Sequence, residues 1–365
     1  MSLPVLQERE AADWRWQARH AVTDLDGLER ALTLSPAERE GARRAIEGGF
    51  PISITPYYLS LCDRVDPSCP IRRQCVPRVE ESVEVAGDLR DPLGEEDHEV
   101  APHLVQRYPD RALLLVSDRC SVYCRFCTRS RMVGQGGGAR SMDALAEAFD
   151  HLEAHPEIRE VIVSGGDPLV ATTRRIEAIL TRLAQIDSLD TVRVATRVPV
   201  TLPMRIDDAL CRALRAFPAT WLMTHFNHPR ELTEASSEAL ARLVDHGVPV
   251  MNQTVLLRGI NDDPETLEAL FRGLVRRRTR PYYLLQADPV RGTGHLRTPI
   301  ATGEAIMARL QGRLSGIALP KLIVDTPGGH GKVPHGPDYV VSRGPGVTRF
   351  RTFRGREVDY LDPPG

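Results

Sequence analysis

Three cysteines, Cys120, Cys124 and Cys127, stand at CxxxCxxC spacing just after an apolar run at residues 112–116. Thiols at such spacing bind a metal ion or an iron–sulfur cluster. A closed zinc site would need a fourth ligand close by, in a second Cys or His pair, and none follows in the sequence. Three thiolates instead suit three irons of a [4Fe–4S] cluster, whose fourth iron stays open to a ligand. The pattern favours a cluster that does chemistry, with three structural or zinc-binding cysteines as the alternative.

A second reactive group lies near the carboxyl end, where residues 325–332 read Asp-Thr-Pro-Gly-Gly-His-Gly-Lys. This run is not a phosphate-binding P-loop, because Thr326 takes the place of that motif's first glycine and Val333 that of its Ser or Thr. The glycines free the backbone to present Lys332 on an exposed loop. A lysine so placed can form an imine with pyridoxal 5′-phosphate (PLP). The alternative from this motif alone is a solvated loop lysine.

The elements that must position these groups follow from a change of pattern near residue 111. Short apolar or β-branched runs recur at residues 112–117, 160–164, 191–196, 220–225, 249–257 and 281–288. Helical stretches separate them at residues 141–154, 173–185, 206–217, 231–245 and 264–277. Such alternation predicts parallel strands with right-handed crossovers. We expect an α/β fold, a partial (β/α)6 TIM-like barrel over residues 111–290.

The flanking regions are expected to be different. Residues 1–110 are predicted to form a helical extension that wraps the barrel. Ser35 and Glu38 form a capping box, with a helix that continues to Ala45 and stops at the two following glycines. Residues 51–110 are rich in Pro and Asp and predict only short helices. Residues 291–365 form the carboxyl-terminal segment that carries Lys332.

Composition excludes several classes of protein. The chain has 365 residues, 42% of them hydrophobic and 26% charged, with a net charge of −2. This charge does not suggest a nucleic-acid-binding protein, and no apolar run approaches membrane-spanning length. Residues 1–10 show no signal-peptide pattern, and the seven cysteines suit a reducing cytoplasm. Cys62, Cys69 and Cys75 are widely spaced, and we expect them to be incidental thiols.

Polar residues gather at the carboxyl ends of the predicted strands, where parallel barrels place their sites. These residues are Ser164, Gly165, Gly166, Asp167, Arg197, His225, Gln253 and Asp288. The glycine pair allows close approach of a ligand to the backbone. His225 is expected to make a hydrogen bond near the ligand, whereas His228 is expected to be an ordinary turn residue.

The chain resembles the lysine 2,3-aminomutase family of radical S-adenosylmethionine (SAM) enzymes. The motifs that carry the resemblance lie at residues 54–60, 107–111, 120–131, 164–167, 224–229, 252–259 and 325–332. They occur in the family's order and cover nearly the whole chain. Phe126 and Leu285 depart from the family's pattern, where relatives carry His and Tyr, and His330 interrupts a glycine run.

The resemblance implies a role for each matching residue. Cys120, Cys124 and Cys127 would bind the cluster, and Lys332 would hold PLP. Arg107 and Arg111 would lie near the PLP phosphate, because guanidinium groups suit bidentate binding. Arg129 would bind the substrate carboxylate, and Asp288 and Asp325 the distal amino group of lysine. The strand-end residues, namely Ser164, Gly165, Gly166, Asp167, Arg197, His225 and Gln253, would contact SAM.

The implied reaction converts L-lysine to β-lysine by migration of nitrogen from C2 to C3 after a 5′-deoxyadenosyl radical has removed a hydrogen. Two carboxylates in one pocket repel each other unless a cation lies between them, so the acid pair favours a basic substrate. A relative that acts on glutamate would need neutral or basic groups in place of these acids, and this chain has neither. An alternative for Asp325 is a simple turn cap.

Several alternatives stay open at this point. The enzyme could act on arginine, or on lysine destined for a translation factor. A non-catalytic iron–sulfur protein is the alternative from another class. The implied partners are an amino acid substrate and a reductant such as flavodoxin or ferredoxin, with no nucleic acid and no membrane. The chain is expected to form a homo-oligomer in the cytoplasm.

Overall fold

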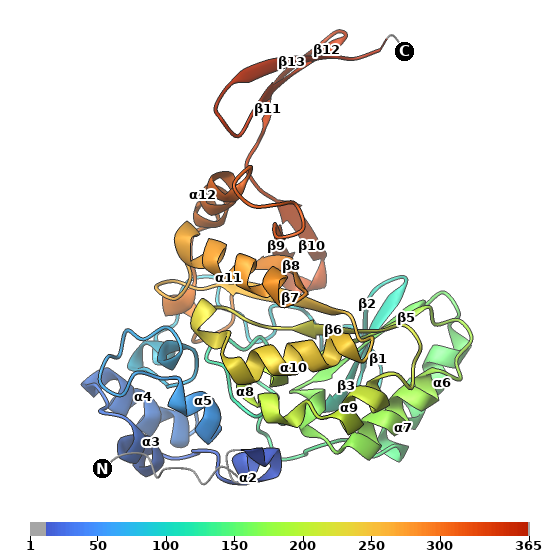
Figure 1. Cartoon of the computed structure of the whole chain (residues 1–365). Coiled ribbons are helices and arrows are strands. Elements are labelled where there is room, and N and C mark those ends of the chain that lie inside the picture. The colour runs from blue at the N-terminus through green and yellow to red at the C-terminus, as the bar shows by residue number, and fades with distance from the viewer. Residues whose placement is uncertain (1–11, 364–365) are drawn as a thin grey trace.

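Ten strands form one continuous sheet at the centre of the molecule (Figure 1). The computed structural model describes residues 12–363. The strands are β1 Glu99–Ala101, β2 Leu104–Tyr108, β3 Arg111–Ser117, β4 Glu160–Gly165, β5 Thr191–Ala195, β6 Thr220–Thr224, β7 Val250–Leu256, β8 Thr279–Gln286, β9 Lys321–Thr326 and β10 Gly331–His335. Their order in the sheet is their order in the chain, as a barrel wall of repeated strand–helix units requires.

Strands β3 to β9 run parallel to one another. The helices between them are α6 Ala146–Ala154, α7 Thr173–Leu183, α8 Val198–Thr201, α9 Asp208–Leu214, α10 Glu234–Asp245, α11 Pro264–Arg276 and α12 Ile300–Leu310. The predicted α/β partial barrel is confirmed. The structure adds a parallel strand beyond the six predicted, because α12 provides one more crossover, from β8 to β9.

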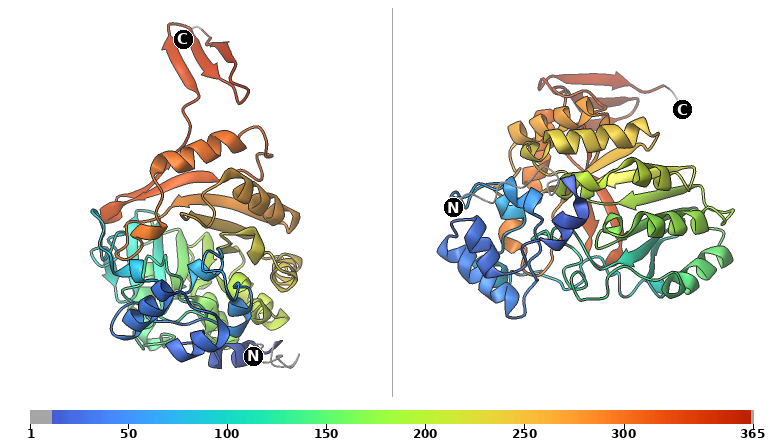
Figure 2. Two further views of the ribbon diagram at one scale, coloured as in Figure 1. Left: turned by 90° about the vertical axis from the view of Figure 1, so that its left-hand side faces the viewer. Right: turned by 60° about the horizontal axis from the view of Figure 1, so that its bottom comes forward.

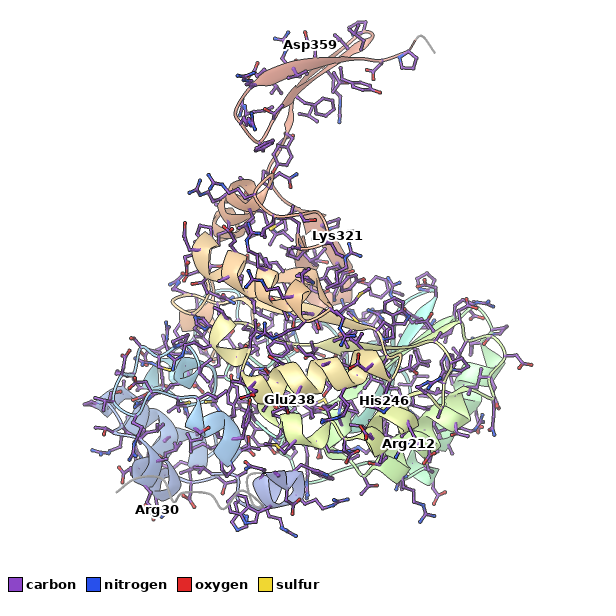
Figure 3. The ribbon with its side chains drawn as sticks, viewed as in Figure 1. Arg30, Arg212, Glu238, His246, Lys321 and Asp359 are labelled. Carbon is purple, nitrogen blue, oxygen red and sulfur yellow. The ribbon has the colours of Figure 1, made fainter. Side chains whose placement is uncertain are left out.

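The outer helices bury one face against the sheet. Helix α7 is an example: its buried side chains recur at helical spacing, at Ile176, Ile179, Leu180 and Leu183. The opposite faces carry charge, as Arg212 on α9 and Glu238 on α10 illustrate (Figure 3). Within residues 12–363, no helix combines the length and apolar character needed to cross a bilayer.

The amino-terminal extension contains helices α2 Trp14–Arg19, α3 Leu25–Ala31, α4 Pro36–Ile46 and α5 Pro56–Ser60. The predicted capping box is confirmed at α4. The Ser35 hydroxyl accepts from the Glu38 amide at 3.3 Å, and the Glu38 carboxylate accepts from the Ser35 amide at 2.8 Å. Glu38 also pairs with Arg72 at 2.6 Å in the protein interior. This buried ion pair fixes the extension, since loss of either partner would leave a buried charge unpaired. The expectation about a signal pattern concerns residues 1–10, which lie outside the described residues.

The rest of the extension is irregular, as predicted, but it also supplies two strands that the sequence did not signal. Strand β2 pairs antiparallel with β3, and β1 pairs with β2. At the other edge of the sheet, β10 pairs antiparallel with β9. The sheet therefore crosses both predicted boundaries, near residues 110 and 290, and the three-part domain division stays a prediction. The 3-10 turns are η1 Arg72–Gln74, η2 Val79–Ser82, η3 Asp143–Leu145, η4 Pro168–Val170, η5 Pro203–Arg205, η6 Pro229–Glu231, η7 Gly294–Leu296 and η8 Pro327–Gly329.

A separate three-stranded antiparallel sheet follows β10 and stands away from the barrel (Figures 1 and 2). Its strands are β11 Val340–Gly344, β12 Val347–Arg351 and β13 Glu357–Leu361. The cavity described below lies within the barrel, and no residue of this small sheet lines it.

Candidate active site

One large cavity, of about 790 Å³, occupies the interior of the partial barrel. Alternate residues of the strands form its wall, because successive side chains of a strand point to opposite faces of the sheet. Every site residue predicted from the sequence lines this cavity. These residues are Cys120, Cys124, Cys127, Arg107, Arg111, Arg129, Ser164, Gly165, Gly166, Asp167, Arg197, His225, Gln253, Asp288, Asp325 and Lys332. The three thiols and the lysine therefore face one shared space.

The cysteine loop follows β3 and is held by the amino-terminal extension. The Tyr123 amide donates to the Ser53 carbonyl at 2.9 Å, and the Arg125 amide donates to the Gln74 carbonyl at 2.9 Å. The guanidinium of Arg125 is buried and pairs with Glu81, with Nε 3.0 Å from the carboxylate. These contacts fix the loop from outside the barrel. The extension thereby positions the thiols, a role that its composition did not reveal.

The chemistry of the three thiols fits a cluster. Burial, followed by the nearby Cys124, raises the pKa of Cys127 to about 11, and burial raises the pKa of Cys120 well above its usual range. A metal that replaces the thiol proton would neutralise the thiolate in these buried surroundings. Among the described residues, no three His, Cys, Asp or Glu side chains converge as one metal ion would require. A cluster needs no such convergence, because its thiolates bind separate irons.

Gly165 and Gly166 pack against the backbone of the cysteine loop. Gly165 has a φ of +127°, and a Cβ there would lie 2.2 Å from the Ser117 carbonyl oxygen. A Cβ on Gly166 would lie 2.4 Å from the Arg119 carbonyl oxygen. The amides of Gly166 and Asp167 donate to these two carbonyls at 2.6 and 2.7 Å. The sequence predicted that these glycines allow a ligand to approach the backbone. In the structure they allow close contact between two protein segments, the end of β4 and the start of the cysteine loop.

Asp167 is buried and organises the end of β5. Its carboxylate accepts hydrogen bonds from the Leu169 amide at 3.0 Å, the Thr196 hydroxyl at 2.7 Å and the Arg197 amide at 2.7 Å. Burial raises the pKa of Asp167 despite these donors. All three donors belong to the protein, so Asp167 positions neighbouring strand ends. Its contact with SAM stays a prediction.

His225, at the end of β6, presents a nitrogen without a protein partner. Its Nε2 is buried and makes no hydrogen bond within the described part of the chain. Burial, followed by the charge of Arg197, lowers the pKa of His225 to about 3. A ring with so low a pKa is neutral near pH 7, and its Nε2 can make a hydrogen bond to a ligand. It packs edge-on against Phe126 at 5.5 Å, and Gln253 lies on the same cavity wall.

Arg129 is held on the cavity wall by Glu95, a residue that the sequence patterns gave no reason to single out. Nε and Nη2 of Arg129 donate to the Glu95 carboxylate at 2.7 to 3.0 Å, and Nη1 donates to the Ser164 hydroxyl at 3.1 Å. The side chain of Glu95 is 3% exposed and also pairs with Arg131 at 3.2 Å. A substrate carboxylate at Arg129 must therefore share the guanidinium with Glu95.

Asp325 has two cations beside it. The carboxylate pairs with Arg107 at 2.6 Å and with the ammonium of Lys332. The register of the β9–β10 hairpin sets Lys332 opposite Asp325, and Arg107 lies on the unpredicted strand β2. The sequence did not predict that these two cations would pair with Asp325.

Asp288 follows β8 and lines the cavity close to Asp325. Burial, followed by the charge of Asp325, raises the pKa of Asp288 to about 7. A carboxylate with so high a pKa is short of positive charge. An ammonium group placed between the two aspartates would offset their mutual repulsion. It would also stabilise the ionised form of Asp288 in its buried position.

Further arginine donors line the cavity on the strands next to the Asp325–Lys332 pair. The guanidinium of Arg111 lies 4.0 Å from the centre of the Tyr108 ring, and the Tyr108 hydroxyl accepts from the Lys332 amide at 2.9 Å. Nε of Arg107 and Nε of Arg193 are buried and make no hydrogen bond to the described residues. Unpartnered buried donors that face a cavity suit an anion. Arg193 was not predicted, although its alternate position on β5 is a signal that could have found it.

Comparisons with known proteins agree with this architecture. A family model of the radical SAM superfamily matches residues 114–270, and one described as lysine-2,3-aminomutase matches residues 307–364. The L-lysine 2,3-aminomutase of Fusobacterium nucleatum is 42% identical over 99% of this chain and 84% of its own length. That of Bacillus subtilis is 44% identical over 98% of this chain and 75% of its own length. The glutamate 2,3-aminomutase of Clostridioides difficile is 39% identical over 98% of this chain and 84% of its own length.

The radical SAM match implies a [4Fe–4S] cluster and SAM as cofactors, and an aminomutase acts on a small amino acid substrate. The similarity extends over nearly the whole chain and includes both the barrel and the carboxyl-terminal segment. The chain therefore belongs to the lysine 2,3-aminomutase family, a family of isomerases within the radical SAM superfamily.

Proposed function

We propose that this chain is a PLP-dependent L-lysine 2,3-aminomutase that forms β-lysine. The observation that carries the proposal is the acid pair, Asp288 and Asp325, in the same cavity as the three thiols and Lys332. When bound, the cluster and SAM would supply a radical that removes hydrogen, and PLP would supply a π-system that delocalises the unpaired electron while the nitrogen migrates. The remaining work falls to the protein: it binds, orients and shields the reactants.

Lys332 would hold PLP, and Arg107 and Arg111 would bind its phosphate. The unpartnered Nε of Arg107 supports this assignment, and the unpartnered Nε of Arg193 adds a further donor. A lysine that holds PLP covalently no longer neutralises Asp325. Asp325 would then keep only Arg107 of its two cations, and the distal ammonium of a lysine substrate would replace the charge of Lys332.

Arg129 would bind the α-carboxylate, and the acid pair the distal amine. A glutamate substrate would instead bring a third carboxylate to Asp288 and Asp325, where the pKa of Asp288 is already raised to about 7. Since like charges in a buried site repel strongly, the arrangement supports lysine over glutamate. Arginine would satisfy the same carboxylates and is the alternative that an experiment must separate. A flavodoxin or ferredoxin as the reductant and a homo-oligomeric state stay predictions.

The test is anaerobic turnover by protein loaded with cluster, PLP and SAM. Lysine, arginine and glutamate are supplied separately, and products are compared with β-amino acid standards by chromatography and mass. We expect β-lysine as the main product. β-Arginine or β-glutamate as the main product would overturn the choice of substrate, and a protein that takes up no iron would overturn the whole proposal. The control is Lys332→Ala, which should give no product with any substrate.

A further inference from the structure

Arg197 places a cation directly on one of the three thiols. It follows β5, and its Nη1 donates a hydrogen bond to Cys124 Sγ at 2.8 Å. The side chain of Arg197 is 8% exposed. The contact therefore lies in a region with little water, where the electrostatic effect of a charge is large.

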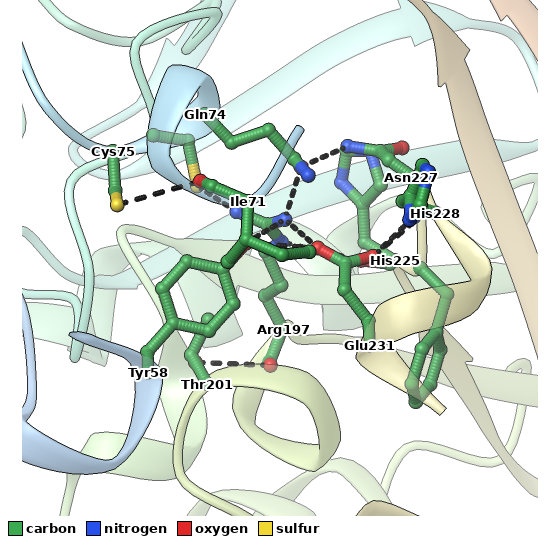
Figure 4. A network of polar contacts seen from close by, with 12 residues as sticks. Tyr58, Ile71, Gln74, Cys75, Arg197, Thr201, His225, Asn227, His228 and Glu231 are labelled. Carbon is green, nitrogen blue, oxygen red and sulfur yellow. Dashed lines mark hydrogen bonds and ion pairs between the residues drawn. The ribbon is translucent and has the colours of Figure 1, made fainter. Parts of the chain in front are cut away.

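The other nitrogens of Arg197 are held by the surrounding protein (Figure 4). Nη2 contacts the Tyr58 hydroxyl at 3.0 Å, Gln74 Oε1 at 2.5 Å and Glu231 Oε1 at 2.8 Å. Nε donates to the His225 carbonyl at 3.2 Å. Contacts on Nε and Nη2 fix both the plane and the position of the guanidinium. As a result, Nη1 remains directed at the sulfur.

Glu231 supplies the compensating charge and is itself fully engaged. Its side chain is fully buried, and it accepts from the Tyr58 hydroxyl at 2.8 Å and from the amides of Asn227 at 2.6 Å and His228 at 3.0 Å. A carboxylate with this many donors is itself fixed. Arg197 and Glu231 therefore form a rigid ion pair whose cationic end faces Cys124.

We propose that Arg197 is a positioning residue for the iron–sulfur cluster: it orients the Cys124 sulfur and raises the reduction potential of the cluster. Hydrogen bonds to cluster sulfurs and nearby net charge are known determinants of this potential. A sulfur bound to iron retains lone pairs that accept hydrogen bonds. Reduction adds one negative charge to the cluster, and a fixed cation stabilises that state more than the oxidised one. The inference rests on the proposed function only in that Cys124 must be a cluster ligand.

This role differs from the SAM contact predicted for Arg197. A guanidinium has five N–H groups, and the contacts above occupy Nε, both hydrogens of Nη2 and one of Nη1. At most one N–H is left for any ligand. The described contacts therefore assign the guanidinium chiefly to the protein and to the sulfur.

The test compares midpoint potentials of the [4Fe–4S] cluster, measured by redox titration with electron paramagnetic resonance in the absence of SAM. The double variant Arg197→Gln/Glu231→Gln removes the cation without leaving a buried carboxylate unpaired. The single variant Glu231→Gln keeps the contact to Cys124 and removes the compensating anion. Arg212→Gln is the control, because it removes the same charge from an exposed position on α9 that does not line the cavity. Iron content and thermal melting are measured for each protein.

We expect Glu231→Gln to titrate at a higher potential than the unmodified protein, and the double variant at a lower potential than Glu231→Gln. Arg212→Gln should match the unmodified protein. Equal potentials in Glu231→Gln and the double variant, both with full iron content, would overturn the proposal. So would a double variant that folds but takes up no iron, because Arg197 would then only shape the loop. If the unmodified protein itself took up no iron, the proposed function would fail instead.

Discussion

Asp325 and Lys332 are direct partners across the antiparallel strands β9 and β10, and the carboxylate of Asp325 is paired with the ammonium of Lys332. Opposite positions on paired strands keep two side chains close whatever else binds in the cavity. Asp325 therefore has this cation beside it only while Lys332 keeps its charge. The pairing links the residue proposed to hold PLP with a residue proposed to bind the substrate's distal amine.

Lys332→Ala should abolish the absorbance of protein-bound PLP and leave the iron content unchanged, because the cysteine loop is held by other residues. Lys321→Ala is the matched control, since Lys321 also lines the cavity but lies at the start of β9. Ultraviolet–visible spectra and iron assays of both variants make the comparison. Retention of the chromophore in Lys332→Ala, or its loss in Lys321→Ala alone, would contradict the assignment.

Asp325→Asn and Asp288→Asn should each lower kcat/KM for lysine by about 10- to 100-fold, the range expected for loss of one hydrogen bond to a charged group. Reductive cleavage of SAM in the absence of lysine should change little, because the acids are expected to contact only the substrate. Turnover and 5′-deoxyadenosine formation are measured side by side. Equal turnover in the variants and the unmodified enzyme would show that Asp288 and Asp325 do not bind the distal amine of lysine.

The raised pKa of Asp288 predicts a pH-dependent stability. In the folded, cofactor-free protein its pKa is raised to about 7, so between roughly pH 4 and pH 7 the folded state keeps a proton that the unfolded state has lost. This stabilisation is complete below pH 4 and is lost as the pH rises through 7. Asp288→Asn should therefore raise Tm more at pH 8 than at pH 4, relative to the unmodified protein. The same Tm difference at both pH values would count against the raised pKa.

Two substitutions of Glu95 should act in opposite directions on substrate binding. Glu95→Gln can still accept a hydrogen bond from Arg129 but no longer neutralises it, so KM for lysine should fall. Glu95→Ala removes the support of Arg129, so KM should rise by roughly 10-fold. Steady-state kinetics at saturating SAM separate the two results. Identical KM values in the two variants would mean that Arg129 does not bind the substrate carboxylate.

Gly166→Ala should disturb the cysteine loop, because its Cβ would lie 2.4 Å from the Arg119 carbonyl oxygen. We expect a loss of about 1–3 kcal/mol in the free energy of unfolding, with a lower iron content. Gly316→Ala is the matched control, since a Cβ there meets no atom within 4 Å. Denaturant unfolding and iron assays test the pair. A Gly166→Ala protein as stable and as iron-rich as Gly316→Ala would contradict the expectation.

Local patterns in the sequence predicted the repeated strand–helix units and missed what depends on partners distant in the chain. The apolar runs that became β3 to β8 are regular enough to read directly. Strand β9 has a similar apolar run at residues 322–324. It follows the irregular stretch 311–320, so the alternation of strand and helix is not clear there. Strands β1 and β2 lie in a Pro- and Asp-rich region, and their pairing with β3 overrides the local signal.

The candidate site shows the same division. Spacing and position identified the thiols and the polar strand-end residues, because strand ends of a parallel barrel converge, whereas Arg107, Arg111 and Arg129 came from the family resemblance. Contacts such as Glu95 with Arg129 and Arg197 with Cys124 join segments far apart in sequence, and no periodicity encodes them. The cations beside Asp325 were missed for that reason: one depends on a hairpin register and the other on an unpredicted strand.

Among the described residues, the main sheet has two free edges, because no backbone ladder joins the amino-terminal strands to β10. Side-chain contacts cross the gap, from Arg107 to Asp325 and from the Tyr108 hydroxyl to the Lys332 amide, together with one backbone hydrogen bond from the Gly328 amide to the Pro92 carbonyl at 2.9 Å. A backbone ladder would hold the wall shut regardless of occupancy. The Arg107–Asp325 ion pair is different, because a ligand that binds either group competes with the pair. Binding of a ligand in the cavity is therefore coupled to the closure of this gap in the sheet.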